Sequence, residues 1–201
     1  MKLKKGILSL LALSMMSLVV GCEKKYELMS HHFTGPFDTI TTYMSYANNE
    51  EEFNEQCDYI EEQLNYYDQL FDKYNTYNGI NNLKTINDNA GKKAIEVDQP
   101  LIDLLNLSIE RNRKISSKVN IAFGSVINIW HDYREEAESH DGVGTVPSDE
   151  ELEKANQHTS IDSIEIDEKK KTVYINDALA SIDVGATAKG YAIELIKDGL
   201  I

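Results

Sequence analysis

The stretch SIDVGATAKGYA, residues 181–192, decides how this sequence is interpreted. Residues 180–184 have a strand pattern that ends in small residues, and residues 187–197 then follow a helical pattern that Gly199 ends. Amides at such a corner favour an anion such as a phosphate, and Lys189 opposes the helix dipole unless an anion compensates it. The residues alone nevertheless favour a strand–helix packing corner with surface charges over a phosphate site.

Upstream of this corner, hydrophobic spacing predicts helices. The longest begins at Glu50 and acids crowd its first turn, where the helix dipole favours them. A second helix begins at Asp98 and Pro100, and a capping box at residues 148–151 begins a third. The face of the long helix repeats every three or four positions, through Phe53, Cys57, Ile60, Leu64, Tyr67 and Phe71.

Strand patterns lie on both sides of these helices. Residues 33–46 predict a strand after a turn at residues 35–36, and residues 94–97 predict a short strand. Residues 161–166 and 172–175 alternate around a charged turn, which predicts a hairpin. The order of strands, helices and strands again predicts an α+β fold, with a mixed or antiparallel sheet and packed helices.

The N-terminus has the pattern of a lipoprotein signal peptide. A basic start is followed by an apolar stretch at residues 7–20, too short for a comfortable membrane span, and then by Cys22. The small residue directly before Cys22 favours lipid attachment over a simple secretion signal. This predicts a protein lipid-anchored to the cell membrane on its extracytoplasmic face. The predicted division is a signal peptide at residues 1–21, a polar tether at 22–32 and one domain at 33–201.

Charge and cysteine content argue against nucleic-acid binding and against a disulfide-stabilised fold. The net charge is −14, and residues 1–21 carry three lysines and no acids, so the predicted mature segment is more acidic still. No basic patch points to nucleic acid. Once Cys22 is acylated a disulfide framework is excluded, and Cys57 is expected in the core. The pair His31-His32 favours a spacer over a metal site, because no third ligand is near.

Four segments together resemble one protein family. Residues 183–192 (DVGATAKGYA) resemble the D-x-G-(A/G)-x-A-K-G-Y-A segment of the ApbE family, the FAD:protein FMN transferases. Residues 35–39 (GPFDT) resemble its N-terminal strand entry, and Tyr74 through Ile86-Asn87 its helix exit. Residues 118–124 (KVNIAFG), leading to Trp130, resemble its G-x-F-D-x-T-x-G…W segment. The resemblance covers residues 33–198 and implies an ApbE-like, T-fold-related domain.

The resemblance implies an activity. Members of this family use Mg²⁺ to cleave the pyrophosphate of FAD and transfer FMN to a Thr or Ser of a partner protein, with AMP leaving; some hydrolyse FAD instead. The implied partner is a flavin-accepting membrane or extracytoplasmic redox protein. Such a transfer requires neutralised pyrophosphate oxygens, an in-line nucleophile and exclusion of water.

The resemblance also implies site residues. Ala186 would offer its carbonyl to Mg²⁺, and Tyr77 could replace Tyr74 because the spacing here is three residues longer. Trp130 is expected as a core anchor, and His131-Asp132 as a solvated helix end. Asn120 stands where many members have Asp, so one carboxylate is missing. The implied FAD contacts are Phe37, Tyr74, Lys118, Val119, Asn120, Asp183 and Lys189.

The last residues, Gly199-Leu-Ile201, begin an apolar run, which we interpret as a truncated chain. The family's remaining metal ligands, an Asp and a Thr late in its sequence, have no counterpart here. A carbonyl alone does not hold Mg²⁺ against its hydration shell. We therefore expect these 201 residues by themselves to be inactive or nearly so. The alternative is a surface lipoprotein that binds or hydrolyses FAD without transferring FMN.

Overall fold

The predicted helix that begins at Glu50 is the longest element of the described structure. The computed structural model describes residues 26–200, so the predicted signal peptide and Cys22 lie outside the described residues. Helix α2 (Glu50–Phe71) begins at Asn49, whose side chain accepts from the Glu52 N–H, and the predicted face of α2 is buried. Cys57 is 6% exposed, which confirms it as a core residue. An N-cap and one apolar face are the local signals that specify such a helix.

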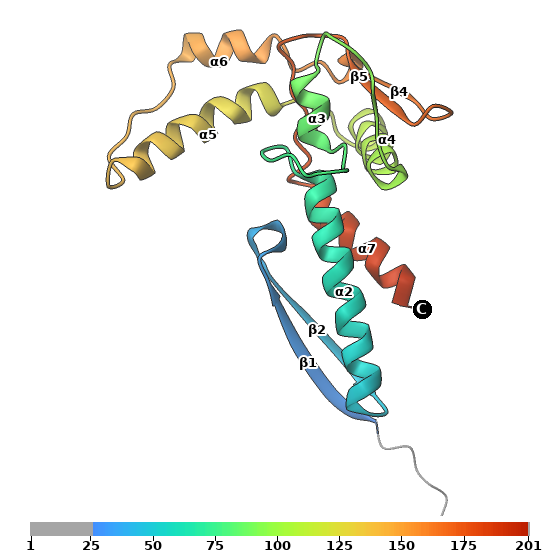
Figure 1. Ribbon diagram of the computed structural model, residues 1–201. Coiled ribbons are helices and arrows are strands. Elements are labelled where there is room, and N and C mark those ends of the chain that lie inside the picture. Colours follow the sequence, from blue (N-terminus) through green and yellow to red (C-terminus); the bar gives the residue numbers. More distant parts are fainter. Residues whose placement is uncertain (1–25, 201) are drawn as a thin grey trace, which may run out of the picture.

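A two-stranded antiparallel hairpin runs alongside α2 (Figure 1). Strand β1 (Glu27–Thr34) pairs with β2 (Ile40–Ala47), from Glu27 opposite Ala47 to Thr34 opposite Ile40. The strand and the turn expected within residues 33–46 are confirmed. The tether expected at residues 22–32 is wrong from Glu27 onward, because ladder hydrogen bonds satisfy that polar backbone while most of its side chains stay exposed.

The elements between residues 83 and 175 form a head at the C-terminal end of α2 (Figure 1). Strands β3, β5 and β4 make a second antiparallel sheet in that order, which confirms the predicted hairpin and the α+β class. The helix predicted from the capping box of Ser148 and Glu151 is also present. The bounds are α3 (Leu83–Asp88), β3 (Ile95–Glu96), α4 (Gln99–Lys114), α5 (Gly124–Ser139), α6 (Asp149–Asn156), η2 (Ile161–Ser163), β4 (Ile164–Asp167) and β5 (Thr172–Ile175).

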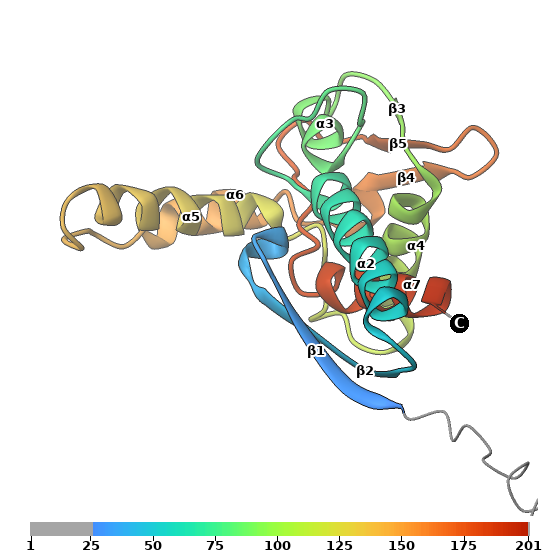
Figure 2. The same ribbon diagram turned by 60° about the horizontal axis from the view of Figure 1, so that its bottom comes forward.

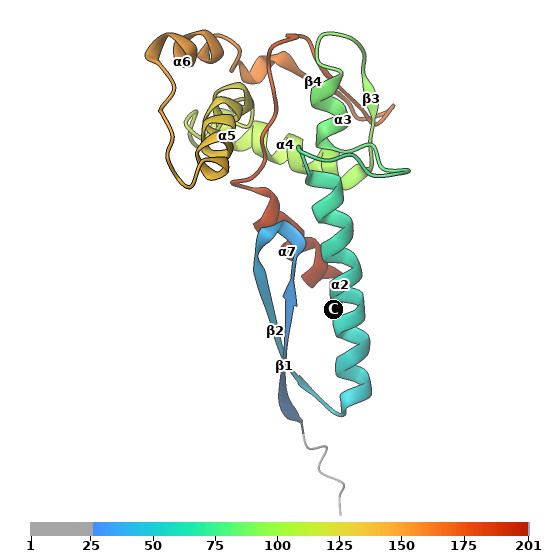
Figure 3. The same ribbon diagram turned by 60° about the vertical axis from the view of Figure 1, so that its left-hand side comes forward.

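Helix α7 (Ala188–Leu200) packs against α2 (Figure 3). The expected stop at Gly199 is wrong, because the helix continues through it to Leu200. A Cβ at Gly199 would overlap the phenol of Tyr59 on α2. The glycine therefore serves close helix–helix packing rather than helix termination.

The strand expected at residues 180–184 does not form a ladder. Among the described residues, its strand-type pairing is a single bridge between Phe123 and Ser181. The Asn87 side chain instead takes both backbone groups of Ile182: Oδ1 accepts from its N–H at 2.8 Å, and Nδ2 donates to its carbonyl at 3.0 Å. On the other edge, the Ser181 carbonyl accepts from the Gly124 N–H at 3.0 Å and the Asp183 N–H donates to the Ile121 carbonyl at 2.8 Å. The Asn87 amide thus takes the place of a neighbouring strand on one edge only.

Helices α5 and α6 project from the head as a paired arm (Figure 2). The expectation of Trp130 as a core anchor is wrong, since it is 47% exposed. His131 and Asp132 lie inside α5 and not at a helix end. Two helices that pack mainly on each other bury only one face each, so a large side chain on another face stays in solvent.

Candidate functional site

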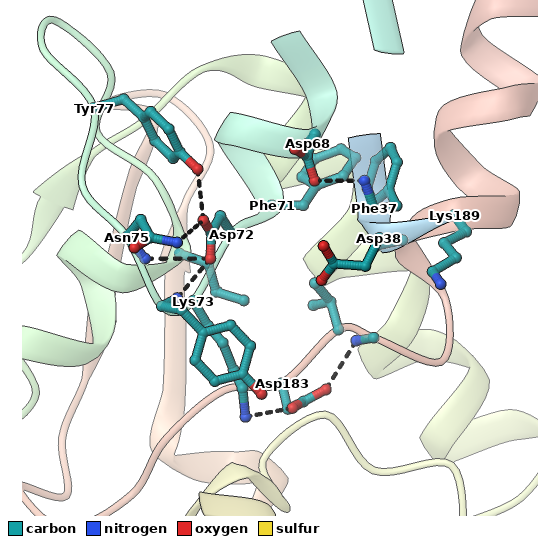
Figure 4. A pocket seen from close by; sticks show the side chains of 15 residues that line it. Phe37, Asp38, Asp68, Phe71, Asp72, Lys73, Asn75, Tyr77, Asp183 and Lys189 are labelled. Atoms are coloured by element: carbon teal, nitrogen blue, oxygen red, sulfur yellow. Dashed lines mark hydrogen bonds and ion pairs between the residues drawn. The ribbon is translucent and has the colours of Figure 1, made fainter. Parts of the chain in front are cut away.

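A pocket of about 400 Å³ lies where three parts of the chain meet (Figure 4). The parts are the hairpin tip at η1 (Pro36–Asp38), the end of α2 with the loop after it, and the turn that leads into α7. Residues far apart in the sequence therefore share one cavity. Its lining includes Phe37, Asp38, Asp68, Phe71, Asp72, Lys73, Tyr74, Asn75, Tyr77, Leu83, Asp183, Val184, Gly185, Ala188 and Lys189.

The hairpin tip enters the pocket in an unusual backbone conformation. Phe37 and Asp38 have φ of 57° and 52°, in the left-handed region that non-glycine residues rarely adopt. The Phe37 N–H donates to Asp68 Oδ1 on α2 at 2.9 Å, which holds the tip against the helix. Burial raises the pKa of Asp68, the Phe37 N–H opposes this, and Asp72 and Asp38 add to it.

The loop after α2 is organised by Asp72. Its carboxylate accepts from the Tyr74 N–H at 2.6 Å, from Asn75 Nδ2 at 3.0 Å and from Tyr77 Oη at 2.7 Å. Burial pushes the pKa of Asp72 upward, but these hydrogen bonds together hold it below its ordinary value. Burial and the bond to Asp72 raise the pKa of Tyr77 to about 12, so its hydroxyl remains a donor. One carboxylate therefore holds both the Tyr74 backbone and the Tyr77 hydroxyl.

A buried ion pair joins this loop to the turn before α7. Lys73 Nζ lies 2.6 Å from Asp183 Oδ2, with the two side chains 7% and 14% exposed. Nζ also donates to Asn128 Oδ1 at 2.9 Å and lies 4.9 Å from the centroid of the Tyr74 ring. Asp183 Oδ1 accepts from the Gly185 N–H at 2.8 Å (Figure 4). Both carboxylate oxygens of Asp183 thus have partners within the protein.

Several of the residues expected to contact FAD meet in this pocket. Phe37, Tyr74, Asp183 and Lys189 line it, and so does the alternative Tyr77. The ring of Tyr74 also packs on His131 of α5, with centroids 4.6 Å apart. These residues come from three separate segments, so only the fold brings them together.

The middle segment lies outside the pocket. Asn120 Nδ2 donates to the Thr159 carbonyl at 2.8 Å, and its Oδ1 accepts from the Ala122 N–H at 2.9 Å. Lys118 and Val119 are exposed in the same loop. Among the residues described, Asn120 therefore organises a turn, which an amide does as well as a carboxylate. Ala186 lies in the exposed turn beside Gly185 and does not line the pocket.

Sequence reasoning singled out neither Asp68 on α2 nor Asp72 and Lys73 directly after it. The position of Lys73 directly before Tyr74, where a segment of family resemblance begins, was the available signal. Its partner Asp183 is 110 positions away, so no local pattern could pair them.

The pocket residues do not fit a metal site made of side chains. Within residues 26–200 no group of three or more His, Cys, Asp or Glu side chains could hold a metal ion. Asp183 pairs with Lys73, Asp72 holds its own loop and Asp68 holds the hairpin tip. Mg²⁺ prefers an octahedral set of oxygens that includes carboxylates. We therefore derive no chemical step through a metal ion.

Comparison with known sequences identifies the family of this chain. The model of the ApbE family matches residues 37–201. The chain belongs to the ApbE family. An FAD:protein FMN transferase from Vibrio cholerae is 24% identical to it over 196 residues, which cover 95% of this chain and 54% of the relative. The chain thus spans about half the length of the curated ApbE relative that it matches.

Solved ApbE structures share the fold. The ApbE protein of Thermotoga maritima has a TM-score of 0.67 at 21% identity, over 87% of this chain and 52% of that one. The flavin transferase ApbE from Vibrio cholerae has 0.64 at 19%, over 87% and 54%. The flavinyl transferase ApbE of Pseudomonas stutzeri in its apo form has 0.68 at 17%, over 87% and 53%. These likenesses confirm the expected α+β, ApbE-like fold.

Proposed function

We propose that this ApbE-family pocket binds FAD, and that the protein transfers FMN from FAD to a Thr or Ser of a partner protein. The observation that carries the proposal is the meeting of four resemblance-implied FAD contacts in one cavity: Phe37, Tyr74, Asp183 and Lys189. Segments this far apart in the sequence converge either to build a core or to bind a ligand. Because these four side chains line a cavity, we propose that they bind a ligand.

The chemistry of the pocket suits a flavin nucleotide. A volume of about 400 Å³ lies in the usual range for small-molecule sites. Phe37 and Tyr74 offer aromatic faces against which an isoalloxazine ring can pack. Lys189 at the start of α7 offers a cation to a pyrophosphate, next to helix amides that favour anions.

The proposed transfer is a phosphoryl-group displacement. The acceptor hydroxyl oxygen forms a bond to the phosphorus of the FMN half and loses its proton. The pyrophosphate bond to the AMP half breaks, and AMP leaves with the electron pair. We assign no residue as the base. In this step Tyr74, Asp183 and Lys189 bind and orient the dinucleotide.

Dependence on Mg²⁺ is part of this proposal and rests on the family resemblance. Bound to the pyrophosphate, the ion would neutralise charge on its oxygens. Four aspartates line the pocket against two lysines, so an anionic dinucleotide gains from any added cation. An FAD titration with and without Mg²⁺ measures this gain directly. Equal FAD affinity and equal turnover in the two conditions would contradict it.

We also propose attachment through a lipid on Cys22 and a location on the extracytoplasmic face of the membrane. The support is the small residue before Cys22 and the apolar stretch before it. None of the helices between residues 26 and 200 has the length and apolar character needed to cross a bilayer. The proposed acceptor is a membrane or extracytoplasmic redox protein. Metabolic labelling with a palmitate analogue, compared between wild type and C22A, tests the anchor.

FAD binding is the first test of the function. The purified chain is titrated with FAD and the quenching of flavin fluorescence is followed, alongside Lys189→Met and Tyr74→Ala. We expect micromolar-range binding by the wild type and at least about tenfold weaker binding by each variant. Lys114→Met is the matched control, since Lys114 pairs with Glu110 on the exposed side of α4 at 2.7 Å. Equal affinity in all four proteins, or none in the wild type, would refute the proposal.

Transfer is then separated from hydrolysis. With FAD, Mg²⁺ and an acceptor domain, covalent flavin on the acceptor together with AMP supports transfer. Free FMN and AMP without covalent flavin support the alternative of a hydrolase, and binding without turnover supports a binding protein.

A further inference from the structure

We propose that Lys73 is a positioning residue of the pocket, which holds Asp183, and through it the Gly185 turn, in the conformation that faces the ligand. The effect on FAD rests on the proposed function, whereas the effect on the turn does not. Neither the family resemblance nor the pattern of the sequence singled out Lys73.

The contacts of Lys73 satisfy its ammonium group within the protein. Nζ carries three N–H donors. One meets Asp183 Oδ2 at 2.6 Å, another meets Asn128 Oδ1 at 2.9 Å, and the Tyr74 ring centroid lies 4.9 Å away. Two of the three donors of Lys73 are on protein oxygens and its side chain is 7% exposed, so it borders the pocket but presents little surface to a ligand. It therefore acts on the pocket through Asp183.

Asp183 transmits this restraint to the turn. One of its oxygens pairs with Lys73 and the other accepts from the Gly185 N–H at 2.8 Å. A Cβ at Gly185 would lie only 3.1 Å from Asp183 Oδ1, so the glycine allows the carboxylate to sit this close to the turn. The next residues then begin α7, whose first turn carries Lys189. The orientation of Asp183 thus sets the shape of the pocket wall at the helix N-terminus.

Two other side chains hold the same segment, which has no strand ladder of its own. Asn87 bonds both backbone groups of Ile182, at 2.8 and 3.0 Å. Asn128 bridges Lys73 to Ser181, with Nδ2 3.4 Å from Ser181 Oγ. Residues 181–183 are therefore held by side chains from α3, from α5 and from the loop after α2, in addition to two backbone bonds to the loop before α5. Of these side chains, Lys73 is the one that lines the pocket.

The energetics of a buried ion pair predict which variants should disturb the turn. Removing one partner leaves the other charge buried without compensation, whereas removing both leaves a neutral site. In Lys73→Met the Asp183 carboxylate would turn toward water and release the Gly185 N–H. In the double variant K73M/D183N the amide oxygen at position 183 can still accept from Gly185, and no uncompensated charge remains.

Hydrogen exchange of the ligand-free protein is the first experiment. We expect the Gly185 amide to exchange at least about tenfold faster in K73M than in wild type. Asn128→Ala, which removes one acceptor of Lys73 and keeps the ion pair, should give a smaller increase, and it provides a folded test protein if K73M does not fold. K114M, which breaks an exposed pair, should leave this exchange unchanged. Unchanged Gly185 exchange in both K73M and N128A would overturn the proposal.

FAD affinity supplies the second readout. If Lys73 acts through Asp183, K73M weakens FAD binding by about tenfold or more, while adding K73M to D183N changes the affinity no further. A merely structural lysine would leave the affinity of K73M equal to wild type once both are folded, and a direct ligand contact would make the two losses additive. Either result overturns the proposal. If wild type binds no FAD but Gly185 exchange rises in K73M, the proposed function fails and the positioning role stands.

Discussion

Replacing Asn87 with alanine tests the idea that an amide side chain takes the place of a neighbouring strand. The substitution removes two hydrogen bonds, and both partners are backbone groups of Ile182, a residue that is 1% exposed. A buried group left without a partner costs about 1–3 kcal/mol. Since Asn87 itself is half-buried and some water can enter, we expect a loss of about 2–4 kcal/mol in the free energy of unfolding.

For a domain of this size each kcal/mol lowers the unfolding midpoint by about 2–4 °C, so N87A should unfold about 5–15 °C below wild type. Urea unfolding followed by circular dichroism gives the free energy directly. Asn106→Ala is the control, because Asn106 donates to an exposed carboxylate of Glu168 at 2.9 Å. Its loss should stay within about 0.5 kcal/mol.

Asn87→Asp refines the test, because aspartate can still accept from the Ile182 N–H but cannot donate to its carbonyl. N87D should therefore be destabilised as well, and more so above the pH at which the carboxylate ionises, where it faces a carbonyl oxygen. If N87A were as stable as N106A, the segment 180–184 would owe its conformation to something other than this side chain, and the reasoning would be refuted.

Three further predictions concern the pocket. Burial raises the pKa of Asp68, so the fold favours its protonated form and loses stability as pH rises from below 3.8 through the folded pKa. The amide in D68N still accepts from the Phe37 N–H, so D68N should raise the unfolding midpoint at pH 7. A lower midpoint would contradict this. Hydrogen bonds outweigh burial and lower the pKa of Asp72, so the stability that Asp72 contributes to the fold is present above pH 3.8 and is lost as pH falls through the folded pKa. D72N should therefore lower the unfolding midpoint at pH 7 and make the stability depend less on pH in acid. Gly185→Ala should weaken FAD binding by about tenfold at little cost in stability, since its Cβ would press on Asp183, and unchanged affinity in a titration would count against the pocket wall described above.

Local patterns predicted most of the secondary structure because the responsible forces act between near neighbours. The spacing of Phe53, Cys57 and Ile60 specifies a helix face, and the capping box at Ser148 specifies a helix start, wherever the rest of the chain lies. The order of strands and helices predicted the α+β fold, and the four segments of family resemblance pointed to the ApbE family. The corner at residues 183–192 was correctly located, with its helix beginning at Ala188.

What only the tertiary structure decided is which of these residues meet. Whether Trp130 is buried depends on the arm formed by α5 and α6, and whether residues 180–184 form a strand depends on Asn87, nearly a hundred positions away. Lys73 and Asp183 are a buried pair because the end of α2 lies beside the turn into α7. Such contacts arise from the summed packing of distant elements, and no window of neighbouring residues records that sum.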